Sequence, residues 1–518
     1  MKKYIYQALI PLLLTSCSDF LKDDSPDLLI PEDVAEFQAV LNGEGYPNDG
    51  YDLNTKTFSD ELDFVQLMTD DVGVSPTSDS RSVLWEGDDE FALASGKGAF
   101  TWAQDIAFYD ASYSNFYLSR YKNILACNVI IENAETMLGS SDKVASCVAQ
   151  AYALRALNYL WLVNLYGLPY NEQTAATDMG VVIRLKSEIS RDQPARNTVK
   201  EVYDQINSDL ERSFELWPKA SYSRNNYLLS ERAVQLIKCR VALYQGKWDD
   251  VIKYGTLLSD SNYDLYNISG IPQNEMTNVA STGDYAFLNP EKNTELVFIF
   301  GGSQFDSNRF MPWLRSMKDA AFVPSQAQEG DLIQSYEEGD QRIYAFFQQS
   351  RNESDGYHDY RYAPNKHYKY GIYSQALRTS EALLSVAEAH VQKGSESDRA
   401  EAVRLLNLLR KNRFTPETYK ELTLADFETS ESLLQFVRDE RRRELCFEDV
   451  HRWVDLRRYG MPRLVHTFYA SKNAAPEVYV LEQGDRNYTL ELPLEELDFN
   501  KVIEPTNRRV IEAGKSSN

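Results

Sequence analysis

Arginine is concentrated in one stretch of the chain, RDERRRELCFEDVHRWVDLRRYG, at residues 438–460. Seven arginines stand there beside a cysteine, a histidine and a tryptophan, although the whole chain carries a formal net charge of −24. Such a cluster can bind an anion, take part in catalysis, or form a buried structural network. An anion-binding site would carry an excess of positive charge, whereas a structural network would balance its arginines with nearby acidic residues.

The same stretch also holds six acidic residues, so its charge is close to neutral. Three acid–arginine pairs stand three or four positions apart, on adjacent turns of a helix: Asp439 with Arg443, Glu448 with Arg452, and Asp455 with Arg458. Trp453 lies on an apolar stripe that needs a partner surface. The sequence therefore predicts a neutral structural lattice around a packed tryptophan, and not an active site.

Motifs for catalysis or metal binding are absent elsewhere in the sequence. The five histidines show neither HExxH nor another metal-ligand spacing, and there is no GxSxG, no P-loop and no GxGxxG between a strand and a helix. Among 78 acidic residues some carboxylates stand close together by chance, so no glycosidase pair is assigned. We expect no enzyme activity and no cofactor, and leave a calcium ion at residues 88–90 as an alternative.

Two loop-like regions, 70–112 and 260–375, mix aromatic residues with Asp, Asn, Gln and Arg. Sugars offer C–H faces that pack on aromatic rings and hydroxyls that need polar partners, so this mixture is typical of a carbohydrate site. The candidate ligand-binding residues are Trp102, Trp313, Tyr285, Phe305, Asn308 and Arg309, followed by Trp85 and Tyr357. The alternative for each aromatic ring is burial as an anchor of its own loop.

Helical periodicity predicts the scaffold that must carry these loops. Helices are expected at 115–138, 143–167 and 198–218, twice within 229–259 with a break at Gly246-Lys247, after 376, and at 398–413, 430–446 and 447–458. Their small-residue and aromatic pattern resembles tetratricopeptide repeats, whose helix pairs stack on their neighbours. Short strands are expected at 295–300 and 488–493. The predicted fold is mainly α, a tetratricopeptide-like helix-pair scaffold with a long loop-rich insertion and few short strands.

The N-terminus, MKKYIYQALIPLLLTSC, has a basic start and an apolar run too short to span a bilayer. It resembles a bacterial lipoprotein signal in which Cys17 is lipidated; a secreted protein with an incidental cysteine is the alternative. The acidic SDFLKDD that follows resembles a Bacteroidetes signal for export to the cell surface. The predicted divisions are a signal peptide (1–16), an N-terminal segment with the aromatic loop (17–113), a helical scaffold (114–259), a ligand-binding insertion (260–375) and C-terminal helices with a tail (376–518).

The net charge bears on the class of binding partner, and the cysteine spacing bears on the presence of disulfides. A net charge of −24 disfavours nucleic acid, because its binding depends on neutralising phosphates. Cys127, Cys147, Cys239 and Cys446 show no CxxC pairing, and three of them lie in apolar helical patterns. Buried free thiols are expected, with two disulfides as the alternative.

RRRELCFEDVHRWVDLRRYG strongly resembles the C-terminal signature of SusD/RagB outer-membrane lipoproteins. The matching positions are Arg442, Arg443, Glu444, Leu445, Glu448, Arg452, Trp453, Asp455, Leu456 and Arg458. AYALRALNYLWLVNLYGLPY (151–170) and LRTSEALLSVAEA (377–389) are similar to two other motifs of this family, with Ser380 where alanine is common. The resemblance covers the whole chain except the two aromatic loop regions.

This resemblance implies a noncatalytic, cell-surface lipoprotein anchored to the outer membrane by its N-terminal lipid. Such proteins capture oligosaccharides and deliver them to a SusC-like TonB-dependent transporter, and they build their ligand site from an N-terminal loop and the central insertion. Three alternatives stay open: a surface glycan hydrolase with an unrecognised site, a structural scaffold whose repeats bind only protein, and a receptor of the same transporter type for a peptide or another nutrient.

Overall fold

A computed structural model describes most of the chain. The described residues are 31–47, 62–74, 96–109, 112–188, 191–221, 225–276, 287–301, 322–326, 328–351, 360–364, 366, 375–470 and 474–515. Their buried apolar side chains form one continuous core that extends from Phe37 to Ile511. The N-terminal helices, the central strands and the C-terminal segment therefore share a single packed interior.

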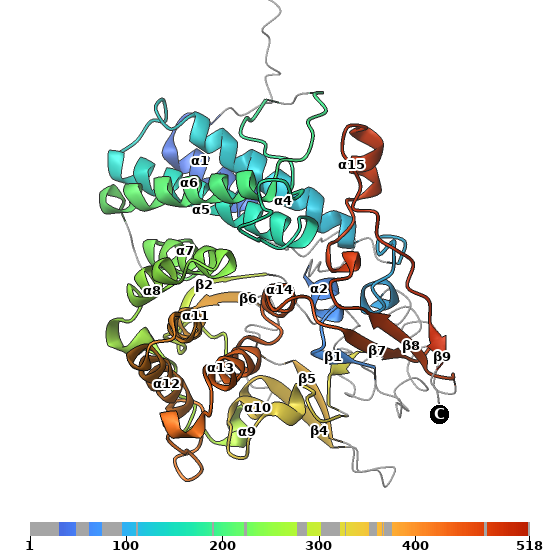
Figure 1. Cartoon of the computed structure of the whole chain (residues 1–518). Coiled ribbons are helices and arrows are strands. Elements are labelled where there is room, and N and C mark those ends of the chain that lie inside the picture. The colour runs from blue at the N-terminus through green and yellow to red at the C-terminus, as the bar shows by residue number, and fades with distance from the viewer. Residues whose placement is uncertain are drawn as a thin grey trace, which may run out of the picture.

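Long helices of the first half form one layer, seen at the top of Figure 1. The layer consists of α1 (Val34–Val40), α4 (Ser112–Glu132), α5 (Ser141–Tyr166) and α6 (Val199–Leu216). Helix α5 contacts both α4 and α6, and twenty of its residues are buried, so it is the centre of the layer. A capping box between Thr198 and Glu201 fixes the start of α6. The three long helices confirm the predictions at 115–138, 143–167 and 198–218.

A second group of helices packs below this layer (Figure 1). It consists of α7 (Glu231–Gln245), α8 (Trp248–Thr256), α11 (Thr379–Lys393), α12 (Glu396–Lys411), α13 (Ser430–Leu445) and α14 (His451–Arg458). Helix α11 contacts α7, α8, α12 and α13. Gly246 ends α7 with a φ of +68°, a backbone conformation that glycine adopts without strain. The predicted break at Gly246-Lys247 is confirmed.

Short strands complete the fold in antiparallel pairs. They are β1 (Val72–Gly73) with β3 (Val323–Pro324), β2 (Leu296–Phe300) with β6 (Gln375–Arg378), β4 (Phe347–Arg351) with β5 (Tyr360–Pro364), and β7 (Leu464–Phe468) with β8 (Glu477–Leu481) and β9 (Gly514–Lys515). The prediction at 295–300 is confirmed by β2. The prediction of a strand at 488–493 is wrong, because these residues pair with no strand and Tyr488 ends the 3₁₀ turn η8 (Arg486–Tyr488).

Shorter helical elements connect these parts. They are η1 (Leu41–Gly45), α2 (Asp63–Leu67), η3 (Trp217–Lys219), η4 (Asp260–Asp264), α9 (Gln273–Met276), η6 (Ile333–Ser335), α10 (Arg342–Ala345), η7 (Leu424–Asp426) and α15 (Leu494–Phe499). The fold is mainly α with few short strands, as predicted. Cys127, Cys147, Cys239 and Cys446 are buried free thiols, which confirms that prediction.

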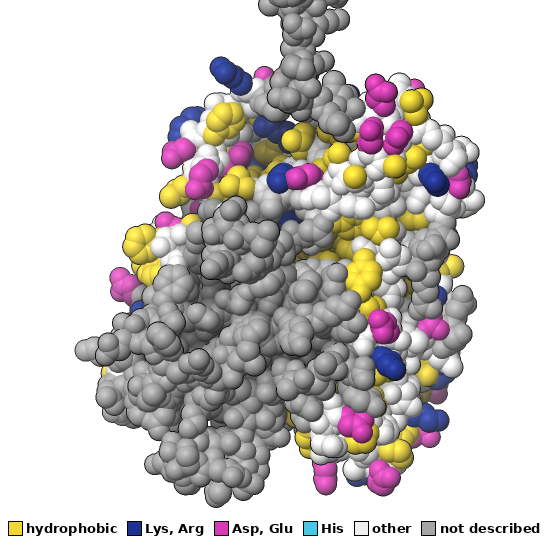
Figure 2. All heavy atoms as spheres, turned by 180° about the vertical axis from the view of Figure 1, so that it is seen from behind, with side chains coloured by type: hydrophobic (Ala, Val, Ile, Leu, Met, Phe, Trp, Pro, Cys, Tyr) yellow, Lys and Arg dark blue, Asp and Glu magenta, His cyan; other side chains and the backbone are white. Residues whose placement is uncertain are grey.

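On the face shown in Figure 2, acidic and basic side chains are interspersed with small hydrophobic areas over the described surface. Within the described part of the chain, no helix has the length and apolar character needed to cross a membrane. Most of the long apolar residues of the helices are instead directed into the shared core.

Candidate functional site

One of the eight predicted ligand-binding residues, Trp102, lies among the described residues. The other seven, which are Trp313, Tyr285, Phe305, Asn308, Arg309, Trp85 and Tyr357, lie outside them, as does the predicted lipidation site Cys17. The described part of the candidate site therefore consists of Trp102 and of the segments that flank the predicted loops.

Trp102 is completely buried. Its Nε1 donates to the carbonyl oxygen of Met68 at 2.8 Å, and its ring stacks on His466 with centroids 4.2 Å apart. A side chain with no accessible surface and a hydrogen-bonded N–H cannot contact a ligand in this conformation. The structure therefore favours, for Trp102, the alternative of an anchor of its loop over a ligand contact.

His466 lies between two aromatic rings, because Phe100 stacks on its other face at a centroid distance of 4.2 Å. Its Nδ1 contacts the carbonyl oxygen of Phe100 at 2.6 Å, and its Nε2 contacts that of Thr69 at 3.0 Å. Burial lowers the pKa of His466 to about 4, and it outweighs the two carbonyl oxygens, which favour the protonated ring. A neutral ring donates to only one of these two carbonyl oxygens, whereas a protonated ring donates to both.

The low pKa of His466 predicts a loss of stability in mild acid. Between its ordinary pKa of 6.5 and its folded value of about 4, the unfolded chain binds a proton that the folded chain does not. This difference should remove up to about 3 kcal/mol of the free energy of unfolding as the pH falls through that range. Urea denaturation at pH 7, 6, 5 and 4 measures it.

The variant His466→Gln should flatten this pH dependence, whereas His390→Gln serves as the matched control. His390 is only partly buried and contacts Asp398 at 2.8 Å. Identical slopes for the wild type and His466→Gln would show that the ring of His466 already carries its proton in the folded protein.

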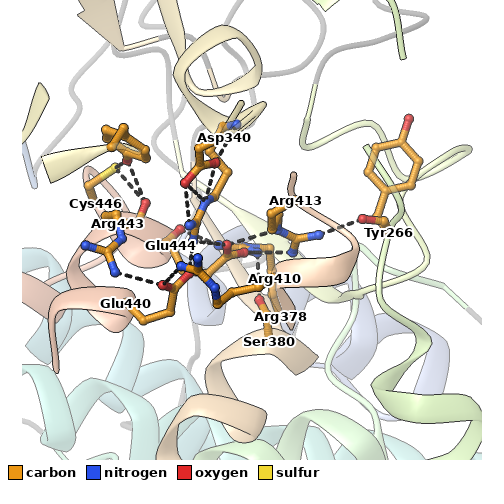
Figure 3. A network of polar contacts seen from close by, with 12 residues as sticks. Tyr266, Asp340, Arg378, Ser380, Arg410, Arg413, Glu440, Arg443, Glu444 and Cys446 are labelled. Atoms are coloured by element: carbon orange, nitrogen blue, oxygen red, sulfur yellow. Dashed lines mark hydrogen bonds and ion pairs between the residues drawn. The ribbon is translucent and has the colours of Figure 1, made fainter. Parts of the chain in front are cut away.

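Glu444, within residues 438–460, is the centre of a buried ionic cluster that Arg443 joins through Glu440 and Arg342 (Figure 3). Three buried guanidinium groups contact this carboxylate, from Arg378 at 2.8 Å, Arg413 at 2.8 Å and Arg342 at 3.2 Å. Burial alone would raise the pKa of Glu444, but Arg413 and Arg378 hold it well below its usual range. Glu444 is therefore ionised and acts as the shared counter-ion of three arginines.

Most partners in this cluster come from distant parts of the sequence. Arg378 also contacts Glu295 and Glu448, each at 2.8 Å, and Arg240 contacts Glu381 and Asp449, each at 2.6 Å. Trp453 is fully buried and stacks on Tyr488 at 5.0 Å. The prediction of a buried structural lattice around a packed tryptophan is confirmed.

The predicted local pairs are mostly wrong. Arg458 does contact Asp455 at 3.0 Å, but Arg443 contacts Glu440 and Arg452 contacts Asp70. Glu448 is bound by Arg378 and Lys366, and Asp439 accepts a hydrogen bond from Gln435. The physical reason is burial, because a charge in the interior needs a partner in the interior, whichever part of the chain supplies it.

Two arginines of the C-terminal signature, Arg442 and Arg452, bind a described segment that borders a predicted ligand loop. Arg452 binds both oxygens of Asp70 at 2.7 Å, and Arg442 binds Asp71 at 2.6 Å. Ser325 in turn donates from its backbone N to the carbonyl oxygen of Asp71 at 2.7 Å. Residues 70–74 and 322–326, which border loops with Trp85 and Trp313, are thereby fixed to helices α13 and α14.

Lys366 connects a third segment to the same cluster. Its Nζ donates to Glu448 at 2.6 Å and to the carbonyl oxygens of Glu444 at 2.8 Å and Cys446 at 2.9 Å, which satisfies all three protons. The carbonyl oxygen of Lys366 accepts from the backbone N of Leu288 at 3.1 Å. The buried ion pairs of helices α13 and α14, together with Lys366, thus fix the segments that border the predicted loops.

The aromatic residues Phe108 and Tyr109 were not selected from the sequence, yet both are exposed. Nothing in their spacing separates them from Trp102, six positions earlier, which is buried. Among the described residues, no group of three His, Cys, Asp or Glu side chains is placed to hold a metal ion. The described part of the site contains exposed aromatic rings and ion pairs.

Packed helices and small antiparallel sheets define the class of protein, a mainly α fold with few short strands. A family described as starch-binding and associating with the outer membrane matches residues 62–243, and the SusD family matches residues 272–505. The two matches together extend over more than half of the chain. The chain belongs to the SusD/RagB family.

Relatives and solved structures agree with this assignment. The SusD-like protein P2 of Formosa agariphila is 25% identical over 98% of this chain and 99% of its own length. A SusD superfamily protein from Bacteroides thetaiotaomicron has a TM-score of 0.67 at 20% identity, covering 92% of this chain and 100% of that one. A SusD-like carbohydrate binding protein from Bacteroides vulgatus has a TM-score of 0.66 at 20% identity, covering 92% and 98%. These structures share the fold described above.

Proposed function

We propose that the protein is a cell-surface glycan-binding lipoprotein that captures oligosaccharides and delivers them to a SusC-like TonB-dependent transporter. The observation that carries the proposal is family membership on both halves of the chain, in a family described as starch-binding and associating with the outer membrane. The carbohydrate-binding name of the Bacteroides vulgatus structure supports the same ligand class. Lipidation of Cys17 would supply the membrane anchor, with no transmembrane helix needed.

A noncatalytic role is supported by the surroundings of the acidic residues near the signature. Glu440, Glu444 and Glu448 are buried, and each is bound by arginine or lysine. A general acid or nucleophile must instead reach the scissile bond of a substrate. Release of reducing sugar by the purified protein from any tested polysaccharide would contradict this part of the proposal.

Binding is tested by affinity electrophoresis in native gels that contain starch, laminarin, galactomannan, alginate or polygalacturonate. Retardation by at least one polymer is the expected result, because exposed aromatic rings beside polar groups hold sugar rings. Unchanged mobility in every gel would contradict glycan capture.

The predicted contact Trp313 gives a sharper test. Trp313→Ala should weaken binding of the retarding polymer about tenfold, because it removes a ring on which a sugar face can pack. Trp248→Ala, on helix α8 and outside the predicted loops, is the control and should bind as the wild type does. Equal affinity of Trp313→Ala and the wild type, measured by isothermal calorimetry, would remove Trp313 from the site.

A further inference from the structure

Phe108 and Tyr109 form an exposed aromatic pair at the end of the segment 96–109. The Phe108 ring is 80% exposed and Tyr109 is 38% exposed, and their centroids are 5.2 Å apart in an edge-to-face arrangement. Single exposed apolar residues are ordinary, but a pair of aromatic rings in a fixed mutual orientation is a surface on which a flat apolar face can pack.

The local backbone holds this aromatic pair in place. Asp105 accepts a hydrogen bond from the backbone N of Phe108 at 3.0 Å, and the backbone N of Tyr109 donates to the carbonyl oxygen of Ile106 at 3.0 Å. Ile106 is buried, so it anchors the turn. Tyr109 packs directly on Gly98, where a Cβ atom would lie 2.6 Å from Tyr109 Cδ2. The backbone that carries both rings is therefore held in place before anything binds.

Next to Gly98, on which Tyr109 packs, Lys97 forms an ion pair. Lys97 Nζ contacts Glu477 Oε2 at 2.9 Å, and the two side chains keep 26% and 33% of their surface exposed. The hydroxyl of Tyr479 donates to the same carboxylate at 2.6 Å. The hydrogen bonds from Lys97 and Tyr479 lower the pKa of Glu477, so it stays an ionised acceptor. Lys97 directly precedes Gly98, the residue on which Tyr109 packs.

Tyr109 brings the two features together. It packs on Gly98 beside Lys97, and it lies close enough to Tyr479 to contribute to the raised pKa of that phenol, after burial and Glu477. One surface, formed by Lys97, Phe108, Tyr109 and strand β8, therefore presents aromatic rings near an ammonium and a carboxylate that are 26% and 33% exposed. In Figure 1 this strand lies in the small sheet with β7 and β9.

The chemistry of this surface selects its ligand. A sugar hydroxyl both donates and accepts, so two neighbouring hydroxyls can accept from Lys97 while donating to Glu477. The apolar C–H face of the same ring can pack on Phe108. The ion pair has no net charge, and the chain around it is strongly acidic at −24, which repels polyanions. An uncharged sugar ring has the hydroxyls and the C–H face, and it is not repelled by the acidic chain. A polymer of uronic acids is negatively charged and is repelled.

We propose that Lys97, Phe108, Tyr109 and Glu477 form an additional contact surface for the uncharged sugar rings of a polysaccharide. The proposal rests on the glycan-binding function proposed above and narrows its ligand to neutral glycans. None of these four residues belongs to the set of ligand contacts predicted from the sequence.

The test uses the full mature protein in native gels with neutral polymers (starch, laminarin, galactomannan) and acidic polymers (alginate, polygalacturonate). Phe108→Ala should weaken binding to the neutral polymer that retards the wild type most by roughly fivefold to tenfold. Lys97→Gln should weaken it in the same direction. Phe499→Ala removes another exposed phenylalanine, 53% exposed on helix α15, and should leave binding unchanged. All three variants should melt at the temperature of the wild type.

The outcomes separate this proposal from the proposed function. Wild-type affinity of Phe108→Ala, while Trp313→Ala binds more weakly, would overturn the additional surface and leave glycan capture intact. Tighter binding of the wild type to the acidic polymers than to the neutral ones would overturn the choice of uncharged sugars. A wild-type protein that no polymer retards would overturn both proposals together.

Discussion

Glu444→Gln should lower the free energy of unfolding by about 3 to 5 kcal/mol, because removal of one member of a buried ionic cluster leaves uncompensated charge in the interior. Glutamine keeps the size of the side chain, so the loss comes from charge and not from a cavity. Arg342, Arg378 and Arg413 all contact this one carboxylate. The remaining acids of the cluster, Glu295 and Glu440 among them, are already engaged with the same arginines.

Chemical denaturation of the wild type and the variant at neutral pH measures this effect. The matched control is Glu431→Gln, the same substitution on the same helix α13 at an exposed position. This control should change stability by less than about 0.5 kcal/mol. A loss below 1 kcal/mol in Glu444→Gln would mean that the other carboxylates neutralise the arginines without it.

Buried ion pairs explain why an acidic protein concentrates arginine in one stretch. Helices α13 and α14 supply cations to the interior, and matching acids come from α11 and from the turn after α2. Because buried charges require such partners, the signature holds these elements at fixed positions. Its consequence for function is indirect, since the segments that border the predicted loops at Asp70, Ser325 and Lys366 are fixed to it.

Sequence periodicity predicted the helices well, because each apolar face repeats within one segment and needs no knowledge of the partner. Helices α5 and α6 begin and end within two residues of the expected positions. The ion pairs are different. Arg452 binds Asp70, which stands 382 positions away, and nothing in the local spacing around Arg452 indicates this choice. Spacing rules describe exposed helix faces, whereas these side chains are buried.

The candidate site was harder to predict for a related reason. Residue type gives the chemistry of Trp102 and Phe108, but only packing decides which ring is covered. Trp102 has a partner for its N–H in Met68 and a stacking partner in His466, so it turns inward. Phe108 lies in the turn that Asp105 caps and stays outside. Two aromatic residues six positions apart in one segment thus take opposite positions, one buried and one exposed.

Trp102→Ala should also destabilise the protein by about 3 to 5 kcal/mol, the usual cost of removing a buried tryptophan and leaving a cavity. The fully buried ring loses its stacking on His466, and the carbonyl oxygen of Met68 loses its donor. Trp102→Phe keeps an aromatic ring beside His466 but has no N–H, so it should cost less, roughly 1 to 3 kcal/mol. Urea denaturation compares the three proteins at pH 7.

The same variants decide between the two roles considered for Trp102. A structural anchor requires a large loss of stability in Trp102→Ala and near-normal glycan affinity in Trp102→Phe. A direct ligand contact requires the reverse, wild-type stability with weaker binding in both variants. Because the ring has no accessible surface and its N–H is already bonded, we expect the first pattern. Calorimetry measures the affinity of Trp102→Phe for the polymer that retards the wild type, at a temperature below the melting temperature of the variant. Weaker binding at wild-type stability would show a direct ligand contact.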